Sequence, residues 1–205
     1  MTVTFAARYE ASGGLTAPAK VLCFALLWCV FASAAWGGFL RTSETNDRRI
    51  SISLSIFPRV VAVDNDFRAK LTRDRKAKII FVYDKDSDKA AELKEGFLEK
   101  SKSVAGMELE VVLASADEII ADGVEEPTAF FLTEQLSNIQ LYGLVKYATL
   151  KQRILFSPFV GDVERGATAG IAVSSRVKPY FNLNTLHKSE IEINALLMKL
   201  SKRYE

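Results

Sequence analysis

Residues 78–83 read Lys-Ile-Ile-Phe-Val-Tyr, a short run dominated by β-branched and aromatic side chains. A run of this kind, bounded by polar residues, is typical of a buried strand. The polar residues 84–88 follow as a loop, in which Ser87 or Asp88 can cap a helix. The predicted helix carries three apolar side chains on one face: Ala90, Leu93 and Phe97.

The alternation of strand and helix continues beyond this unit. Further apolar runs predict strands at residues 109–113, 129–132 and 153–156. Ser115 and Glu118 have the spacing of a capping box for a short helix. Residues 136–150 predict a longer helix, with three side chains at helical spacing: Ile139, Tyr142 and Tyr147. This order predicts a three-layer α/β sandwich around a mostly parallel, doubly wound sheet.

The C-terminal part has a different pattern. Residues 170–174 and 180–183 predict two strands of an antiparallel hairpin, joined by a polar turn that ends in Pro179. We expect a final helix after the hairpin, with Asn184 as its N-cap. Its expected buried stripe consists of Ile193, Leu196, Leu197 and Leu200.

The N-terminal segment has the pattern of a secretory signal peptide. Lys20 precedes the uncharged apolar run 21–31, and Ala32-Ser33-Ala34 is a small-residue cleavage pattern. We therefore expect a signal peptide over residues 1–34, with an uncleaved membrane anchor as the alternative. The periplasm is the expected location, and both cysteines, Cys23 and Cys29, lie inside the apolar run.

The rest of the chain divides into a linker over residues 35–49 and a single domain over residues 50–205. Residues 50–63 are compatible with a helical stripe and with strand alternation, and we favour a helix. The formal net charge of +2 arises from interspersed acidic and basic residues. This balance indicates no nucleic-acid partner.

Three patterns resemble chemical sites, but each has a simpler interpretation. Asp84, Asp86, Asp88 and Glu95 occupy carboxylate positions of a calcium loop, yet Lys89 stands where that loop needs glycine. The spacing of Gly161 and Gly166 is that of a phosphate loop without its Lys and Ser or Thr. His187 is the single histidine, and no nucleophile elbow accompanies it. We therefore predict no catalytic residue, cofactor or metal, and leave calcium binding open.

The segment 157–166 is the best candidate for an interaction loop. It follows the carboxyl end of a predicted strand, where open α/β sheets place their ligands. Aromatic and arginine side chains are enriched at protein interfaces, and we expect Phe159 to be exposed here. The alternative is an ordinary ordered loop with a surface ion pair. The candidate interaction residues are Ser157, Phe159, Asp162, Glu164 and Arg165.

The C-terminal third resembles the YfiR family of periplasmic proteins. A strand that begins with Gly170 is followed by Phe181-Asn182-Leu183-Asn184, in the place of an aromatic-x-aliphatic-Asn strand end, and then by a Leu-rich run that ends at Leu200. The resemblance covers residues 128–205. It implies an exported α/β protein without enzymatic activity. The mature domain lacks the cysteines of the redox-responsive members, so redox control is not expected.

Two functions follow from these observations. The resemblance implies a regulatory or adaptor protein that binds an inner-membrane signalling protein, such as a diguanylate cyclase of cyclic-di-GMP signalling, with an outer-membrane lipoprotein as a further partner. A homodimer is also compatible with the resemblance. The alternative is a periplasmic solute-binding module. It predicts a pocket at the carboxyl ends of the strands, lined by the loops after Tyr83, Ala114, Glu134 and Ser157.

Overall fold

The sheet is built from strands that match the predicted apolar runs. The computed structural model describes residues 45–125 and 127–205, so the predicted signal segment lies outside the described residues. A first helix covers residues 45–62. The elements that follow are η1 (Phe67–Lys70), β1 (Ala77–Tyr83), α2 (Ser87–Lys100), β2 (Ser103–Val104), β3 (Met107–Ser115), α3 (Ala116–Ala121), β4 (Ala129–Leu132), α4 (Asn138–Leu150), β5 (Ile154–Ser157), β6 (Ala169–Val173), β7 (Val177–Asn182), α5 (Leu183–Lys188), α6 (Ala195–Leu200) and β8 (Lys202–Tyr204).

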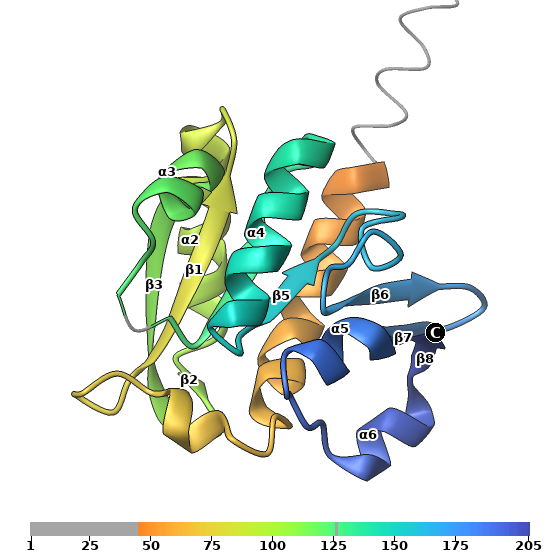
Figure 1. Ribbon diagram of the computed structural model, residues 1–205. Coiled ribbons are helices and arrows are strands. Elements are labelled where there is room, and N and C mark those ends of the chain that lie inside the picture. The colour runs from red at the N-terminus through yellow and green to blue at the C-terminus, as the bar shows by residue number, and fades with distance from the viewer. Residues whose placement is uncertain (1–44, 126) are drawn as a thin grey trace, which may run out of the picture. The chain divides into compact units, whose positions relative to one another are not determined.

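The eight strands form one sheet in the order β2-β3-β1-β4-β5-β6-β7-β8. Strands β3, β1, β4, β5 and β6 run parallel to one another, and β7 pairs antiparallel with β6. The first helix and α2 cover one face, while α3 and α4 cover the other (Figure 1). The predicted three-layer α/β sandwich with a mostly parallel sheet and a C-terminal hairpin is therefore confirmed.

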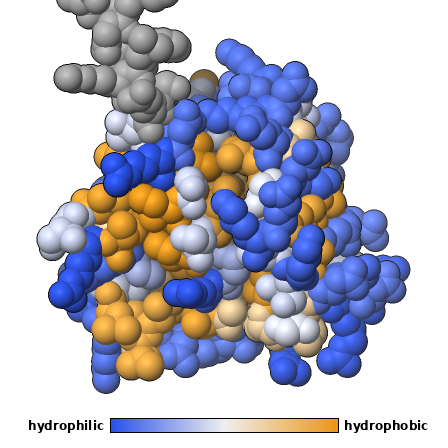
Figure 2. Space-filling view, turned by 180° about the vertical axis from the view of Figure 1, so that it is seen from behind, coloured by the Kyte–Doolittle hydropathy of each residue, from blue (hydrophilic) through white to orange (hydrophobic). Residues whose placement is uncertain are grey.

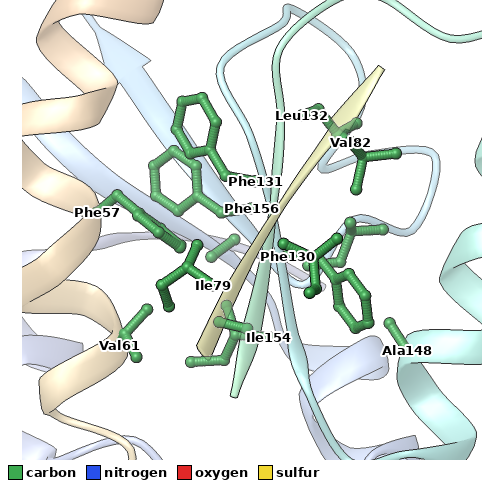
Figure 3. Packing of buried hydrophobic residues seen from close by; sticks show 14 of the residues in the cluster. Phe57, Val61, Ile79, Val82, Phe130, Phe131, Leu132, Ala148, Ile154 and Phe156 are labelled. Atoms are coloured by element: carbon green, nitrogen blue, oxygen red, sulfur yellow. The ribbon is translucent and has the colours of Figure 1, made fainter. Parts of the chain in front are cut away.

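The central strands are apolar throughout because helices cover both of their faces. On β4, the ring of Phe131 packs against Phe57 of the first helix, while the next ring, Phe130, packs against Tyr147 of α4. Figure 3 shows Phe131 with Phe57 on one side of the sheet and Phe130 on the other side, toward Ala148 of α4. The first helix is thus part of the core, which confirms the helical interpretation of residues 50–63.

The boundary between the linker and the domain differs from the prediction. Residues 45–49, expected to lie in the linker, already belong to the first helix, and the compact unit spans Asn46–Glu205. Arg49 holds this part of the helix against the sheet. Its guanidinium donates to the carbonyl oxygens of Pro158 at 2.7 Å and Ile171 at 3.2 Å, where β5 has ended beside β6.

The prediction for the C-terminus is wrong in two respects. The expected final helix is divided into α5 and α6, and the chain ends in β8, which pairs with β7. No residue of α6 is buried, and Leu196 and Leu200 are exposed. Ile193 is buried, but in an isolated bridge to Asp64 instead of a helix. The spacing of the apolar residues is also compatible with one long helix. No local pattern in the sequence shows that the last residues form β8 and pair with β7.

Candidate functional site: the carboxyl edge of the sheet

The order of the strands places a switch point between β1 and β4. The chain leaves β1 toward β3 on one side, whereas β4 lies on the other side of β1. In open α/β sheets, ligands bind outside the carboxyl ends of the strands at such a point. The loops after β1 and β4 meet at this edge, as the solute-binding hypothesis predicts for them.

One side chain joins these two loops. Oε1 of Glu134, in the loop after β4, accepts hydrogen bonds from three successive backbone N–H groups: those of Asp84, of Lys85 at 2.6 Å and of Asp86 at 3.3 Å. Consecutive N–H groups that converge in this way form a concave site for an anionic oxygen. The loop after β1 therefore offers a three-donor anion site that a carboxylate of the same chain occupies.

Gln140 connects this site to the first turn of α3, which directly follows β3. Its Nε2 donates to Oδ1 of Asp84 at 2.7 Å and to Oδ1 of Asp117 at 3.2 Å. Ser137 and Gln140 form a capping box at the start of α4, which holds the Gln140 side chain at the edge of the sheet. Two loops and the first turns of α3 and α4 thus place donors and carboxylates within hydrogen-bonding distance of one another.

One of the acidic residues after β1 has a structural role at the start of α2. Asp86 is the N-cap of α2, since its Oδ1 accepts from the backbone N–H of Lys89 at 2.8 Å. Residues 45–125 and 127–205 contain no group of three or more His, Cys, Asp or Glu side chains that could hold a metal ion. His187 is exposed on α5.

The candidate interaction loop is held together by a buried carboxylate. Asp162 is fully buried; its Oδ2 accepts from Oγ of Ser157 at 2.6 Å, and its Oδ1 accepts from Arg165. Arg165 also donates to Oδ1 of Asn138, the first residue of α4. These contacts connect the loop after β5 to the same edge of the sheet as Glu134 and Gln140.

The expectation that Phe159 is exposed is wrong. Its side chain is 5% exposed and belongs to the core, because the turn at Ser157 and Pro158 directs it inward. The neighbouring Val160 is 71% exposed instead. On α4, Ile139 and Tyr142 are 85% and 72% exposed, since the helix turns Leu141, Leu144 and Ala148 toward the sheet.

The Asp162 contacts predict a measurable stability effect. We expect Asp162→Ala to lower the free energy of unfolding by about 1–3 kcal/mol, because Ser157 loses its acceptor in a buried position. Urea unfolding measures this change. Val160→Ser, in the same loop but at the surface, should stay within about 0.5 kcal/mol of the wild type. Equal effects of the two variants would contradict the structural role of Asp162.

The predicted N-cap is displaced by two residues. Asn182, not Asn184, caps α5: its Oδ1 accepts from the backbone N–H of Thr185 at 2.9 Å, and Asn184 is exposed within the helix. The reason is that Asn182 has a second role. Its Nδ2 donates to the carbonyl of Val163 at 2.7 Å, which fastens the interaction loop to the start of α5.

Glu164 is exposed and accepts a hydrogen bond from the Tyr180 hydroxyl at 3.1 Å. Burial, together with this bond to a carboxylate, raises the pKa of Tyr180 to about 12 from its ordinary value of 10.0. A pKa raised by folding stabilises the protein below the ordinary pKa, and this contribution is lost as the pH rises through the folded pKa.

Tyrosinate absorbance measures this effect. We expect the Tyr180 hydroxyl to ionise near pH 12. The absorbance change that is missing from the Tyr180→Phe variant identifies the signal of Tyr180. Glu164→Gln should lower this pKa without restoring the ordinary value, since the burial remains. Ionisation of Tyr180 at its ordinary pKa in the wild type would show that the hydroxyl is not held by Glu164.

A scan against protein-family models finds no match, and a search of curated proteins finds none either. Solved structures with similar folds include the ABC domain in complex with L-Trp from Streptococcus pneumoniae, at 15% identity and a TM-score of 0.43 over 70% of this chain and 61% of that one. A conserved domain protein from Vibrio cholerae O1 has 14% identity and a TM-score of 0.47, over 67% and 57% of the two chains. A substrate-binding protein with adhesive properties from Clostridium difficile, in its ligand-free, open form, has 16% identity and a TM-score of 0.45, over 70% and 60%.

The chain therefore spans about 60% of the length of these structures. Similarity at this level concerns the arrangement of strands and helices alone. Along the described part of the chain, no helix is long and apolar enough to cross a membrane.

Proposed function

We propose that this chain is a non-enzymatic binding module that works in the periplasm and holds a small solute at the carboxyl edge of its sheet. The observation that carries the proposal is the convergence of three backbone N–H groups on one oxygen of Glu134 at the switch point. The N-terminal signal pattern supports the location. The position of the site at the carboxyl ends of parallel strands supports ligand binding.

The chemistry of the edge favours a zwitterionic solute. A solute carboxylate that displaces Glu134 would accept hydrogen bonds from the N–H groups of residues 84–86, and bonds to charged acceptors are the stronger ones. Asp84 and Asp117, which Gln140 holds beside this site, would attract the solute's ammonium group. A purely anionic solute would face these carboxylates without a compensating charge.

Three matched probes test this proposal by calorimetry: leucine, 3-methylbutylamine without the carboxylate, and 4-methylpentanoate without the ammonium group. We expect leucine to bind more tightly than the other two. Glu134→Ala should strengthen binding because the competing carboxylate is gone, and Asp117→Asn should weaken it about tenfold. The absence of binding to both the wild type and Glu134→Ala, or equal binding of all three probes, would overturn the proposal.

A second candidate function is a regulatory protein of the YfiR type, which controls an inner-membrane diguanylate cyclase. It is supported by the exposed apolar side chains beside the interaction loop: Ile139, Tyr142 and Val160. Apolar and aromatic residues of this kind form the centres of protein interfaces. In this function an outer-membrane lipoprotein would release the complex.

Site-specific photo-crosslinking tests this second function. A crosslinking residue at Val160 should capture a membrane-bound cyclase in intact cells, and Tyr142→Ser should reduce the yield several-fold. The same residue at exposed Glu99 of α2, on the opposite face of the sheet, should capture no cyclase. Equal capture from both faces would contradict a YfiR-type interface at the loop.

A further inference from the structure

A groove of about 1190 Å³ lies between the first helix and α2, on the face of the sheet opposite to α4. Ile52 and Leu54 of the first helix and Leu93 of α2 line it, and all three are partly exposed. In Figure 2, which shows this face, hydrophobic residues lie over the first helix beside the hydrophilic residues of α2. The groove therefore has an apolar floor between two helical walls.

The dimensions of the groove favour a helix over a small molecule. Pockets for small ligands are enclosed and measure about 300–1,000 Å³. This groove is slightly larger and is bounded by two helices, and proteins bind the apolar face of a further helix in apolar grooves of this kind. Gly96, halfway along the α2 wall, adds room, since a Cβ built there would meet no atom within 4 Å.

The charges around the groove define the partner. Asp86, Asp88 and Glu92 line the end of the groove at the start of α2. Lys89, which lies between them in the sequence, already pairs with Asp47 across the groove at 2.6 Å. The opposite end carries Lys100. The acidic end is complementary to basic side chains, so the groove has a polarity as well as an apolar floor.

We propose that this groove binds an amphipathic helix of a partner protein, with its apolar face on the floor and its Lys or Arg residues at the end formed by Asp86, Asp88 and Glu92. This surface adjoins the carboxyl-edge site between β1 and β4, because Asp86 lines the groove while its backbone N–H donates to Glu134 in that site.

Gly96→Trp tests the proposal because it fills the groove without removing a contact. Glycine inside a helix is unfavourable, so the variant should fold at least as stably as the wild type. The probe is a synthetic amphipathic peptide of leucine and lysine, about 18 residues or five helical turns long. We expect Gly96→Trp to bind it at least tenfold more weakly, whereas Tyr142→Ser on α4 binds it as the wild type does.

The charge requirement has its own test. A peptide with glutamate in place of lysine should bind the wild type at least tenfold more weakly, and the double variant Asp88→Lys, Glu92→Lys should reverse this preference. Thermal unfolding establishes that each variant is folded. The proposal is overturned if neither peptide binds, if both bind equally, or if Gly96→Trp binds the lysine peptide as tightly as the wild type.

Discussion

Asp64→Ala is expected to lower the free energy of unfolding by about 3–5 kcal/mol, because it leaves the ammonium group of Lys70 buried without a partner. The two side chains are 4% and 6% exposed, and Nζ of Lys70 lies 2.5 Å from Oδ2 of Asp64. Asp64 also accepts from the backbone N–H of Asp66 at 3.0 Å. A loss of this size is a large part of the total stability of a domain, which is about 5–15 kcal/mol.

The position of the pair explains its importance. The backbone N–H of Asn65 donates to the carbonyl of Glu192, and that of Asn194 donates to the carbonyl of Val63. The end of the first helix is therefore joined to the segment between α5 and α6 at the point where the ion pair is buried. Thr128 adds a third connection, since its hydroxyl donates to the carbonyl of Lys70 at 2.8 Å.

A matched set of variants separates the buried charge from the packing. The double variant Asp64→Leu, Lys70→Met should lose much less stability than either single change, because no unpaired charge remains. Lys85→Ala, at a fully solvated position, serves as the surface control. Urea unfolding measures all four proteins. A single Asp64 variant as mild as Lys85→Ala would show that the pair is not buried in solution.

Phe57→Ala is the second large effect, with an expected loss of about 3–5 kcal/mol. The ring is fully buried and packs against Phe97 of α2, Phe131 of β4 and Phe156 of β5, with centroid distances of 6.4, 5.2 and 5.3 Å. Figure 3 shows the Phe57 ring between the first helix and the sheet, and its removal leaves a cavity there.

The control for Phe57→Ala is Arg59→Ala, two residues along the same helix but exposed. It should change the free energy of unfolding by less than about 0.5 kcal/mol. If both variants unfold at the same urea concentration as the wild type, the first helix is not part of the cooperative core. The Phe57 variant should also weaken binding of the lysine peptide, because the first helix forms one wall of the groove.

The central sheet and one helix cap could be predicted from local patterns, whereas the cap of α2 is Asp86 instead of Ser87 or Asp88. The prediction for β4 matches Ala129–Leu132, and the Ser115 and Glu118 capping box is present. The prediction for β1 differs by one residue at its start. These features depend on short-range rules: a strand buried on both faces must be continuously apolar, and the first N–H groups of a helix need an acceptor nearby in the sequence.

The candidate site was predictable only in part. The parallel order of the strands predicts that the segments after Tyr83, Ala114 and Glu134 lie together at the carboxyl edge of the sheet. The same order does not predict the hydrogen bonds of Glu134 to residues 84–86, because no local sequence pattern shows whether an acidic residue after a strand accepts from the backbone of another loop or is solvated. The inward direction of the Phe159 side chain could likewise not be predicted from the sequence, since it depends on the backbone conformation at Ser157 and Pro158.

The sequence alone determined the strand and helix alternation of this protein. Strands buried on both faces and helix caps can each be recognised from a few adjacent residues. The tertiary structure decided everything that depends on distant partners. Asp64 and Lys70 become a buried pair where the segment around Ile193 crosses, and β8 replaces a helical end because β7 offers it an open edge. The energies of such contacts depend on which segments meet, and no local sequence pattern predicts contacts between residues far apart along the chain.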